Sequence, residues 1–277
     1  MSSNSYRLIR TLLPILLTAS LSACFSSGGG GYYMDDGPHS SVPVNPHSVK
    51  DAVPKREPLS RGGNKPYSVF GKRYTPMKSA AGYRERGIAS WYGKKFHGRR
   101  TSNGESYNMY AMSAAHKTLP LPSYVRVTNL KNGRSVIARV NDRGPFLHNR
   151  IIDLSYTAAT RLGIVATGTG LVEVKAVNVD NYQPDPTPVT QLASAAKTSG
   201  NNRIYLQLGA FSDVNNAYRL QARLESAISN VIIVKGSANG RSVHRVRVGP
   251  LNDVSAVDRI ASRIRSLGIY NSHVVIE

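Results

Sequence analysis

The chain has 277 residues, with 36 Lys and Arg against 16 Asp and Glu and a formal net charge of +20. This length allows about two domains, and the charge favours polyanionic partners such as nucleic acid, a membrane surface or an anionic wall polymer. The sequence has no nucleic-acid-binding motif and no Cys/His pairs at zinc spacing. We therefore expect no nucleic acid partner, no metal and no cofactor.

The N-terminus has the pattern of a secretory signal. Two arginines precede a short apolar run, too short to span a bilayer, which ends at Leu21-Ser22-Ala23-Cys24. Cys24 is the only cysteine, and the four residues resemble a bacterial lipobox. The resemblance implies a signal peptide over 1–23, cleavage before Cys24 and a lipid anchor on Cys24. Phe25 in place of Asp favours the outer membrane by family analogy. A plain signal peptide with an incidental cysteine is the alternative.

Composition divides the rest of the chain into four parts. Residues 24–82 are rich in Pro, Gly and Ser and predict a tether that lets an anchored protein reach away from the membrane. Residues 83–179 carry strand signals, residues 180–200 read as a second linker, and residues 201–277 form a second domain.

Short strands are predicted in the first domain, at 87–92, 124–128, 135–140 and 171–177. Asn132-Gly133 is a strong signal for a two-residue hairpin. Ser155 can cap a short helix that ends at Gly163. Several short strands at this spacing predict a small closed barrel, so this domain is mainly β.

The C-terminal part contains an internal repeat. Three positions match at an offset of forty: Gly209 with Gly249, Phe211 with Leu251, and Asp213 with Asp253. Each copy reads strand, helix, strand, with the apolar helix residues on one face. The pattern predicts a βαββαβ domain of the α+β class, with a four-stranded antiparallel sheet covered by two helices on one face and open to a ligand on the other.

Three polar residues between Thr101 and Pro145 are candidates for acid–base chemistry. Glu105 lies in a Gly-rich loop, where it is either solvated or partly buried by nearby aromatic rings. Burial would favour its acid form and suit it to protonate a glycosidic oxygen. Asp142 follows a predicted strand and either points into a cleft or only braces a turn. His116 either holds a carboxyl, carries a proton or is structural.

Other residues near these three have weaker signals. Asp153, flanked by apolar residues, is interpreted as structural, either paired with an arginine such as Arg143 or Arg150 or capping the next helix. Three aromatic residues have flat faces suited to stacking on sugar rings, and core filling is an equally good interpretation. They are Trp91, Tyr92 and Tyr107.

Five segments together resemble the rare lipoprotein A (RlpA) family: GIASWYG, TSNGESYNMYAMSAAHKTLP, YVRVTNLKNGRSV, VNDRGPF and RIIDLS. The resemblance implies a six-stranded double-psi β-barrel and an endolytic lytic transglycosylase. Such an enzyme cleaves the bond between N-acetylmuramic acid (MurNAc) and N-acetylglucosamine (GlcNAc) in peptidoglycan without water and leaves 1,6-anhydro ends. The family's functional glutamate, histidine and aspartate fall on Glu105, His116 and Asp142. Substrate-binding candidates in the barrel are Trp91, Tyr92, Tyr107, Asn108 and Arg143.

The C-terminal repeat resembles a SPOR domain, which implies binding to glycan strands stripped of stem peptides at the division septum. Candidates on its open sheet face are Tyr205, Gln207, Arg245 and Arg247. The implied setting is an outer-membrane lipoprotein facing the periplasm, with peptidoglycan, the membrane and division-site proteins as partners. Asn108 departs from the family pattern, in which Asp is common. The alternatives are a non-catalytic wall-binding protein of the septum and a hydrolase that uses water.

Overall fold

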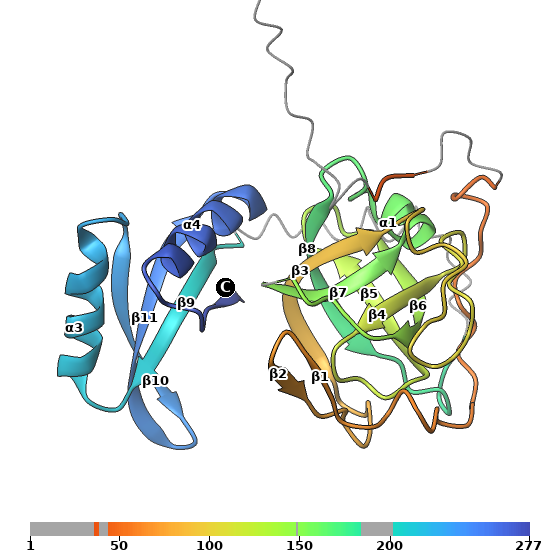
Figure 1. Cartoon of the computed structure of the whole chain (residues 1–277), viewed down its shortest axis with the longest axis horizontal. Helices are drawn as coiled ribbons and strands as arrows, with labels where there is room; N and C mark the ends of the chain where they lie inside the picture. Colours follow the sequence, from red (N-terminus) through yellow and green to blue (C-terminus); the bar gives the residue numbers. More distant parts are fainter. Residues whose placement is uncertain (1–35, 39–43, 148, 184–201) are drawn as a thin grey trace, which may run out of the picture.

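The computed structural model describes residues 36–38, 44–147, 149–183 and 202–277. These residues form a β-barrel and a smaller α+β domain that lie side by side (Figure 1). None of the helices in these ranges is long and apolar enough to cross a bilayer. The predicted signal peptide, Cys24 and most of the second linker lie outside the described residues.

Six strands close the barrel in the order β3-β7-β4-β6-β5-β8. They are β3 Arg84–Tyr92, β4 Ser113–His116, β5 Ser123–Asn129, β6 Ser135–Asp142, β7 Arg150–Ser155 and β8 Thr169–Ala176. β3 runs parallel to β7, and β4 parallel to β6, while the other neighbours are antiparallel. The closed six-stranded barrel confirms the predicted fold class.

The barrel core follows from strand periodicity. Val125 and Val127 of β5 are fully buried at alternate positions, as expected where one strand face meets a core. The helix α1 Tyr156–Leu162 begins after Ser155, whose Oγ accepts a hydrogen bond from the Ala158 N–H at 3.2 Å. It ends at Gly163, which has the left-handed φ of 74° that glycine tolerates best. Both ends agree with the sequence prediction.

The segment before the barrel differs from the predicted tether. Residues 44–82 pack on the barrel and include a hairpin of β1 Tyr67–Val69 and β2 Lys72–Tyr74. The Ala52 N–H donates to the Ile137 carbonyl at 3.1 Å, and Glu57 forms an ion pair with Arg139 at 2.8 Å. The tether prediction does not hold for residues 44–82, because partners on the barrel satisfy the polar groups of a Pro-rich segment.

The C-terminal domain has the predicted order of elements. They are β9 Ile204–Phe211, α3 Val214–Glu225, β10 Val231–Ala238, β11 Arg241–Leu251, α4 Val254–Ser266 and β12 His273–Ile276. The antiparallel sheet has the order β10-β11-β9-β12. Asp213 caps the N-terminus of α3, and Asp253 caps the N-terminus of α4. The two copies of the sequence repeat therefore begin their helices at equivalent residues.

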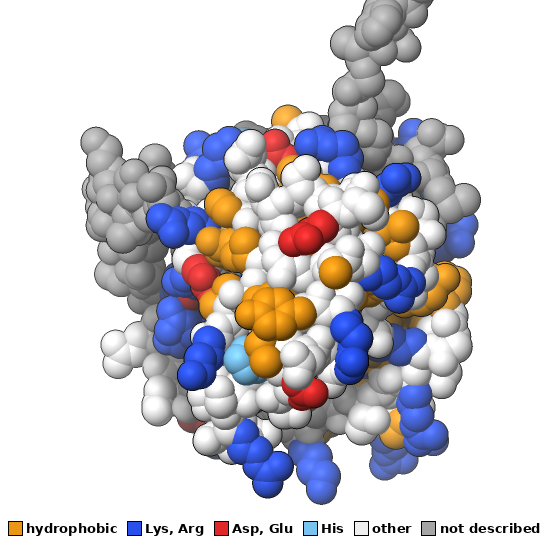
Figure 2. Space-filling view, turned by 90° about the vertical axis from the view of Figure 1, so that its left-hand side faces the viewer, with side chains coloured by type: hydrophobic (Ala, Val, Ile, Leu, Met, Phe, Trp, Pro, Cys, Tyr) orange, Lys and Arg blue, Asp and Glu red, His pale blue; other side chains and the backbone are white. Residues whose placement is uncertain are grey.

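The surface of the C-terminal domain is basic. Figure 2 shows Lys and Arg side chains spread over the end of the molecule that carries α3, around a patch of hydrophobic side chains. Exposed cations include Arg219 and Arg223 on α3, Lys235 on β10 and Arg241 on β11. A dispersed positive surface of this kind attracts anionic polymers without forming one specific site.

Candidate active site

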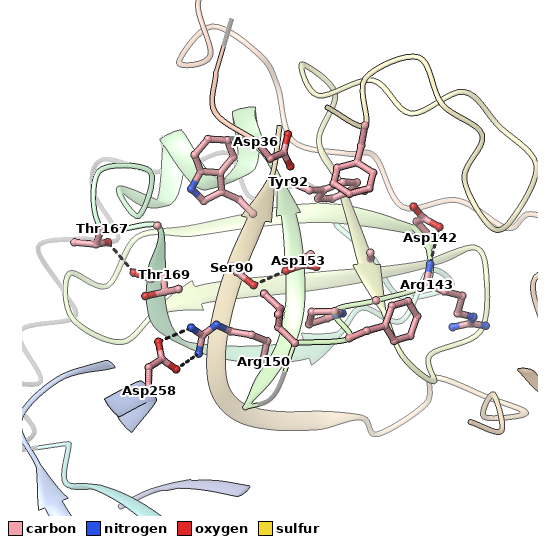
Figure 3. A pocket seen from close by; sticks show the side chains of 18 of the residues that line it. Asp36, Ser90, Tyr92, Asp142, Arg143, Arg150, Asp153, Thr167, Thr169 and Asp258 are labelled. Carbon is pink, nitrogen blue, oxygen red and sulfur yellow. Dashed lines mark hydrogen bonds and ion pairs between the residues drawn. The ribbon is translucent and has the colours of Figure 1, made fainter. Parts of the chain in front are cut away.

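A cavity of about 590 Å³ opens beside the parallel strands β3 and β7 (Figure 3). Its walls include Ser90 and Trp91 of β3, Asp153 of β7, and Asp142 at the end of β6. Asp36 and Asp258 also line this cavity, together with several aromatic side chains. A hollow with apolar walls and a few polar groups is the usual composition of a ligand site. Within the described residues, no group of three or more His, Cys, Asp or Glu side chains is arranged to hold a metal ion.

Asp153 is the functional candidate that the sequence interpretation missed. The parallel register of β3 and β7 sets Asp153 opposite Ser90, and the Ser90 hydroxyl donates to Asp153 Oδ1 (Figure 3). Burial raises the pKa of Asp153 to about 6, against smaller lowering effects of Ser90, Arg150 and Lys117. A carboxyl that keeps its proton close to neutral pH can act as a general acid.

The hydrogen-bond partners of Asp153 differ from the two that the sequence interpretation expected. The Arg143 guanidinium donates to the carbonyls of Gly63, His116 and Leu119, whereas Arg150 pairs with Asp258. The cap of α1 is Ser155. With neither an arginine partner nor a capping role, Asp153 is left facing the cavity with Ser90 as its hydrogen-bond donor.

Asp142 enters the same cavity from the end of β6. Its Oδ1 accepts hydrogen bonds from the Ser102 N–H at 2.8 Å, the Ser102 hydroxyl at 2.6 Å and the Arg143 N–H at 2.7 Å. Donors from two separate loops therefore fix this carboxylate in one position. The negative charge of Asp142 also raises the pKa of Asp153, so the ionisation of Asp153 depends on the charge of its neighbour.

Glu105 lies outside this cavity, and its surroundings favour the charged carboxylate and not the acid form that the sequence interpretation expected. Arg139 donates to both its oxygens, at 2.7 and 2.8 Å, and Asn141 donates to Oε2 at 2.9 Å. These bonds, led by that of Arg139, lower the pKa of Glu105 to about 2, so its acid form is disfavoured. Glu105 lines a second cavity with Asn108. The bond from Asn141, the residue before Asp142, connects Glu105 to the loop that carries Asp142.

Replacing Glu105 with glutamine tests this assignment through stability. We expect Glu105→Gln to lower the free energy of unfolding by about 1 kcal/mol at neutral pH, since the side chain is 43% exposed and solvent weakens the pair. The pKa of Glu105 is lower in the folded state, so its contribution is present above pH 4.5 and is lost as pH falls towards 2. Urea unfolding at pH 7 and pH 3 should show the two proteins converging in acid. A constant gap would contradict the assignment.

His116 is buried and braces the end of β4. Its Nδ1 accepts from the backbone N–H groups of Thr118 at 3.1 Å and Leu119 at 2.9 Å, and its Nε2 lies 2.8 Å from the Tyr83 hydroxyl. Burial lowers the pKa of His116 to about 3. The lowered pKa favours the neutral ring, and its hydrogen bonds among the described residues go to Tyr83, Thr118 and Leu119 and not to Glu105 or Asp142. This position suits a brace better than a proton carrier.

The aromatic candidates differ in whether they line the cavity or pack in the protein core. Trp91 is half-buried and lines the cavity with Tyr92. Tyr107 is buried, stacks on Tyr92 with ring centroids 4.0 Å apart, and donates to the Tyr92 carbonyl at 2.6 Å. Asn108 is exposed, and its Oδ1 accepts from the Tyr110 N–H at 2.9 Å. Trp91 is therefore the aromatic residue best placed to stack on a sugar ring.

The sheet residues proposed to bind glycan are largely covered in this structure. Tyr205, Gln207 and Arg247 are all buried. Arg247 donates to Gln207 at 3.2 Å and pairs with Glu277 at 2.6 Å. Arg245 is half-buried and donates to the Ser237 carbonyl at 2.7 Å. These polar groups already satisfy one another, so a ligand on this face would have to displace existing bonds.

Comparisons with known proteins agree with this architecture. Residues 84–176 match the family described as "Lytic transglycolase", and residues 200–276 match the family described as "SPOR domain". These two matches define the chain as a lytic transglycosylase barrel followed by a SPOR domain. The chain is 42% identical over 260 residues to "Endolytic peptidoglycan transglycosylase RlpA" of Vibrio cholerae, covering 94% of each protein. The chain belongs to the RlpA family, as the sequence resemblance predicted.

Two further likenesses were found. A Pseudomonas aeruginosa protein (strain UCBPP-PA14) with the same name is 38% identical over 290 residues, covering 86% of this chain and 84% of that protein. Among solved structures, "Crystal structure of RlpA SPOR domain from Pseudomonas aeruginosa" has 33% sequence identity and a TM-score of 0.25, and it covers 26% of this chain and 96% of that one.

Proposed function

We propose that the protein is an endolytic peptidoglycan lytic transglycosylase that cleaves the MurNAc–GlcNAc bond of glycan strands lacking stem peptides. The observation that carries this proposal is the pair of carboxyl groups, Asp153 and Asp142, in one cavity beside Trp91. The barrel's family match and the names of the relatives support the reaction class and the polymer. The basic surface suits strands whose lactyl groups carry free carboxylates.

The proposed reaction uses the two carboxyl groups in different states. Asp153, whose pKa is raised to about 6, gives its proton to the glycosidic oxygen as the bond to the MurNAc anomeric carbon breaks. The C6 hydroxyl oxygen of the same MurNAc bonds to that carbon, and its proton passes to the Asp142 carboxylate. The negative charge of Asp142 also stabilises the positive charge that develops on the sugar ring. No water is consumed, and solvent returns the proton from Asp142 to Asp153.

The cellular setting is the second part of the proposal. A lipid anchor on Cys24 would hold the enzyme at the outer membrane, facing the periplasm. The SPOR domain would direct it to peptide-free glycan at the septum, where cleavage supports cell separation and wall remodelling. The lipobox sequence and the SPOR match support this setting.

Product analysis tests the proposed activity. The purified protein is incubated with peptide-free glycan strands in oxygen-18 water, and the new chain ends are examined by mass spectrometry. We expect 1,6-anhydro-MurNAc ends, lighter than reducing ends by one water and without the isotope. Labelled reducing ends would instead identify a hydrolase. Co-sedimentation with the strands and no new ends would identify a wall-binding protein.

A further inference from the structure

The SPOR domain packs directly on the barrel wall that carries the active-site strands. Ile88 of β3 is fully buried and belongs to the same apolar cluster as Leu206 of β9 and Val257 of α4, and Leu171 of β8 packs against this cluster. Apolar side chains from both domains thus form one shared core at the interface. The domain contact is therefore part of the packing of β3, which also carries Ser90 and Trp91.

Among the residues that the structure describes, one ion pair crosses this interface, and it lies at the cavity. Arg150 of β7 donates to both oxygens of Asp258 on α4, from Nη1 at 3.0 Å and from Nη2 at 2.7 Å. The Arg150 side chain is 9% exposed, and both residues line the same cavity as Asp153 and Asp142. Figure 3 shows the Arg150 side chain reaching toward Asp258 and away from the Ser90–Asp153 pair.

Arg150 depends on the SPOR domain for its position. Its guanidinium has Asp258 as its hydrogen-bond partner, and its buried Nε has no partner among the described residues. The other cations near Asp153 are held by the barrel itself. Lys117 donates to the Arg150 carbonyl, and Arg143 donates to carbonyls such as that of Gly63. Among these three cations, only Arg150 would lose its side-chain partner if the SPOR domain moved.

We propose that Asp258 of the SPOR domain is a positioning residue for catalysis: it holds the Arg150 guanidinium away from Asp153, so that Asp153 retains the proton that it must donate. This inference rests on the proposed role of Asp153 as the acid. It links the docking of the glycan-binding domain to the protonation state of the barrel's catalytic carboxyl. A barrel without a docked SPOR domain would have a freed guanidinium beside its acid.

The direction of the effect follows from the groups that face Asp153. Ser90, Arg150 and Lys117 lower the pKa of Asp153, and Asp142 raises it, while burial has the largest effect and raises it. The carboxyl also lies near Tyr92 and Tyr107, whose pKa values are raised chiefly by burial. A guanidinium released from Asp258 would find Asp153 as a carboxylate partner in the same cavity, and a direct ion pair favours the ionised acid.

The test is the pH dependence of kcat/KM on peptide-free glycan strands, measured with the full chain. Activity should decline above the pKa of the acid, and in Asp258→Asn we expect this decline to begin about one pH unit lower. At pH values above this decline, kcat/KM of Asp258→Asn would then be about tenfold lower than that of the wild type. Arg150→Gln should move the decline in the opposite direction, to higher pH, and the double variant should resemble Arg150→Gln. Glu225→Gln, at the exposed end of α3, controls for loss of one SPOR carboxylate and should match the wild type.

Each other outcome overturns the proposal. An unshifted decline in Asp258→Asn shows that the ion pair does not control the acid. Shifts in the same direction for Asp258→Asn and Arg150→Gln show that the ion pair only stabilises the domain interface. The proposed function fails separately, if Asp153→Asn keeps wild-type activity. An inactive Asp153→Asn together with an unshifted Asp258→Asn rejects this inference alone.

Discussion

Asp153→Asn is expected to lower kcat about a thousandfold on peptide-free glycan strands, because an amide has no proton to give to the leaving oxygen. KM should change much less, since asparagine keeps the shape of the side chain and can still accept from Ser90. Product release followed by mass spectrometry gives the rate. Glu173→Gln, a matched change at a carboxylate of β8 that pairs with Arg84 and Arg86, should stay within about twofold of the wild type.

Thermal unfolding separates loss of the acid from loss of the fold. The pKa of Asp153 is higher in the folded protein than its ordinary value of 3.8, so ionisation of this group destabilises the fold as pH rises from about 4 through 6. The neutral amide of Asp153→Asn avoids this penalty. We therefore expect its Tm at pH 8 to equal or exceed that of the wild type. An inactive variant with a much lower Tm would leave Asp153 a structural residue.

Asp142→Asn is expected to lower kcat about a hundredfold, which is the usual effect of removing one group that stabilises transition-state charge. The asparagine can keep the bonds that its oxygen accepts from Ser102, so the loop should stay in place. Single-turnover rates at saturating glycan measure the chemical step directly. Glu105→Gln should have a smaller effect than Asp142→Asn, because Glu105 acts only by positioning the loop. Equal losses would mean that Glu105 does more than position the loop.

The sequence predicted the parts of the structure that depend on local pattern. The hairpin signal at Asn132-Gly133, the cap at Ser155 and the matched caps at Asp213 and Asp253 all depend on residues close together in the chain. The strands β4 and β7 were missed, because their short sequences, SAAH and RIIDLS, have no clear polar and apolar alternation. The six-strand count came from the family resemblance.

The active site needed long-range contacts that no local pattern carries. Ser90 and Asp153 meet only because β3 and β7 run parallel. Glu105 looked like an acid in a loop, but Arg139 lies against it from β6 and favours its charged form. One signal in the sequence could have identified Asp153: a carboxyl within the apolar segment RIIDLS needs a partner or a function, and the structure supplies a cavity.

The protonation state of Asp153 is the central claim, and it can be measured directly. Carbon-13 NMR of the aspartate carboxyl groups, titrated from pH 3 to pH 8 and assigned by comparison with Asp153→Asn, gives the midpoint for this residue. The account predicts a midpoint near 6. A midpoint near the ordinary value of 3.8 would mean that Asp153 is ionised at physiological pH and cannot be the acid.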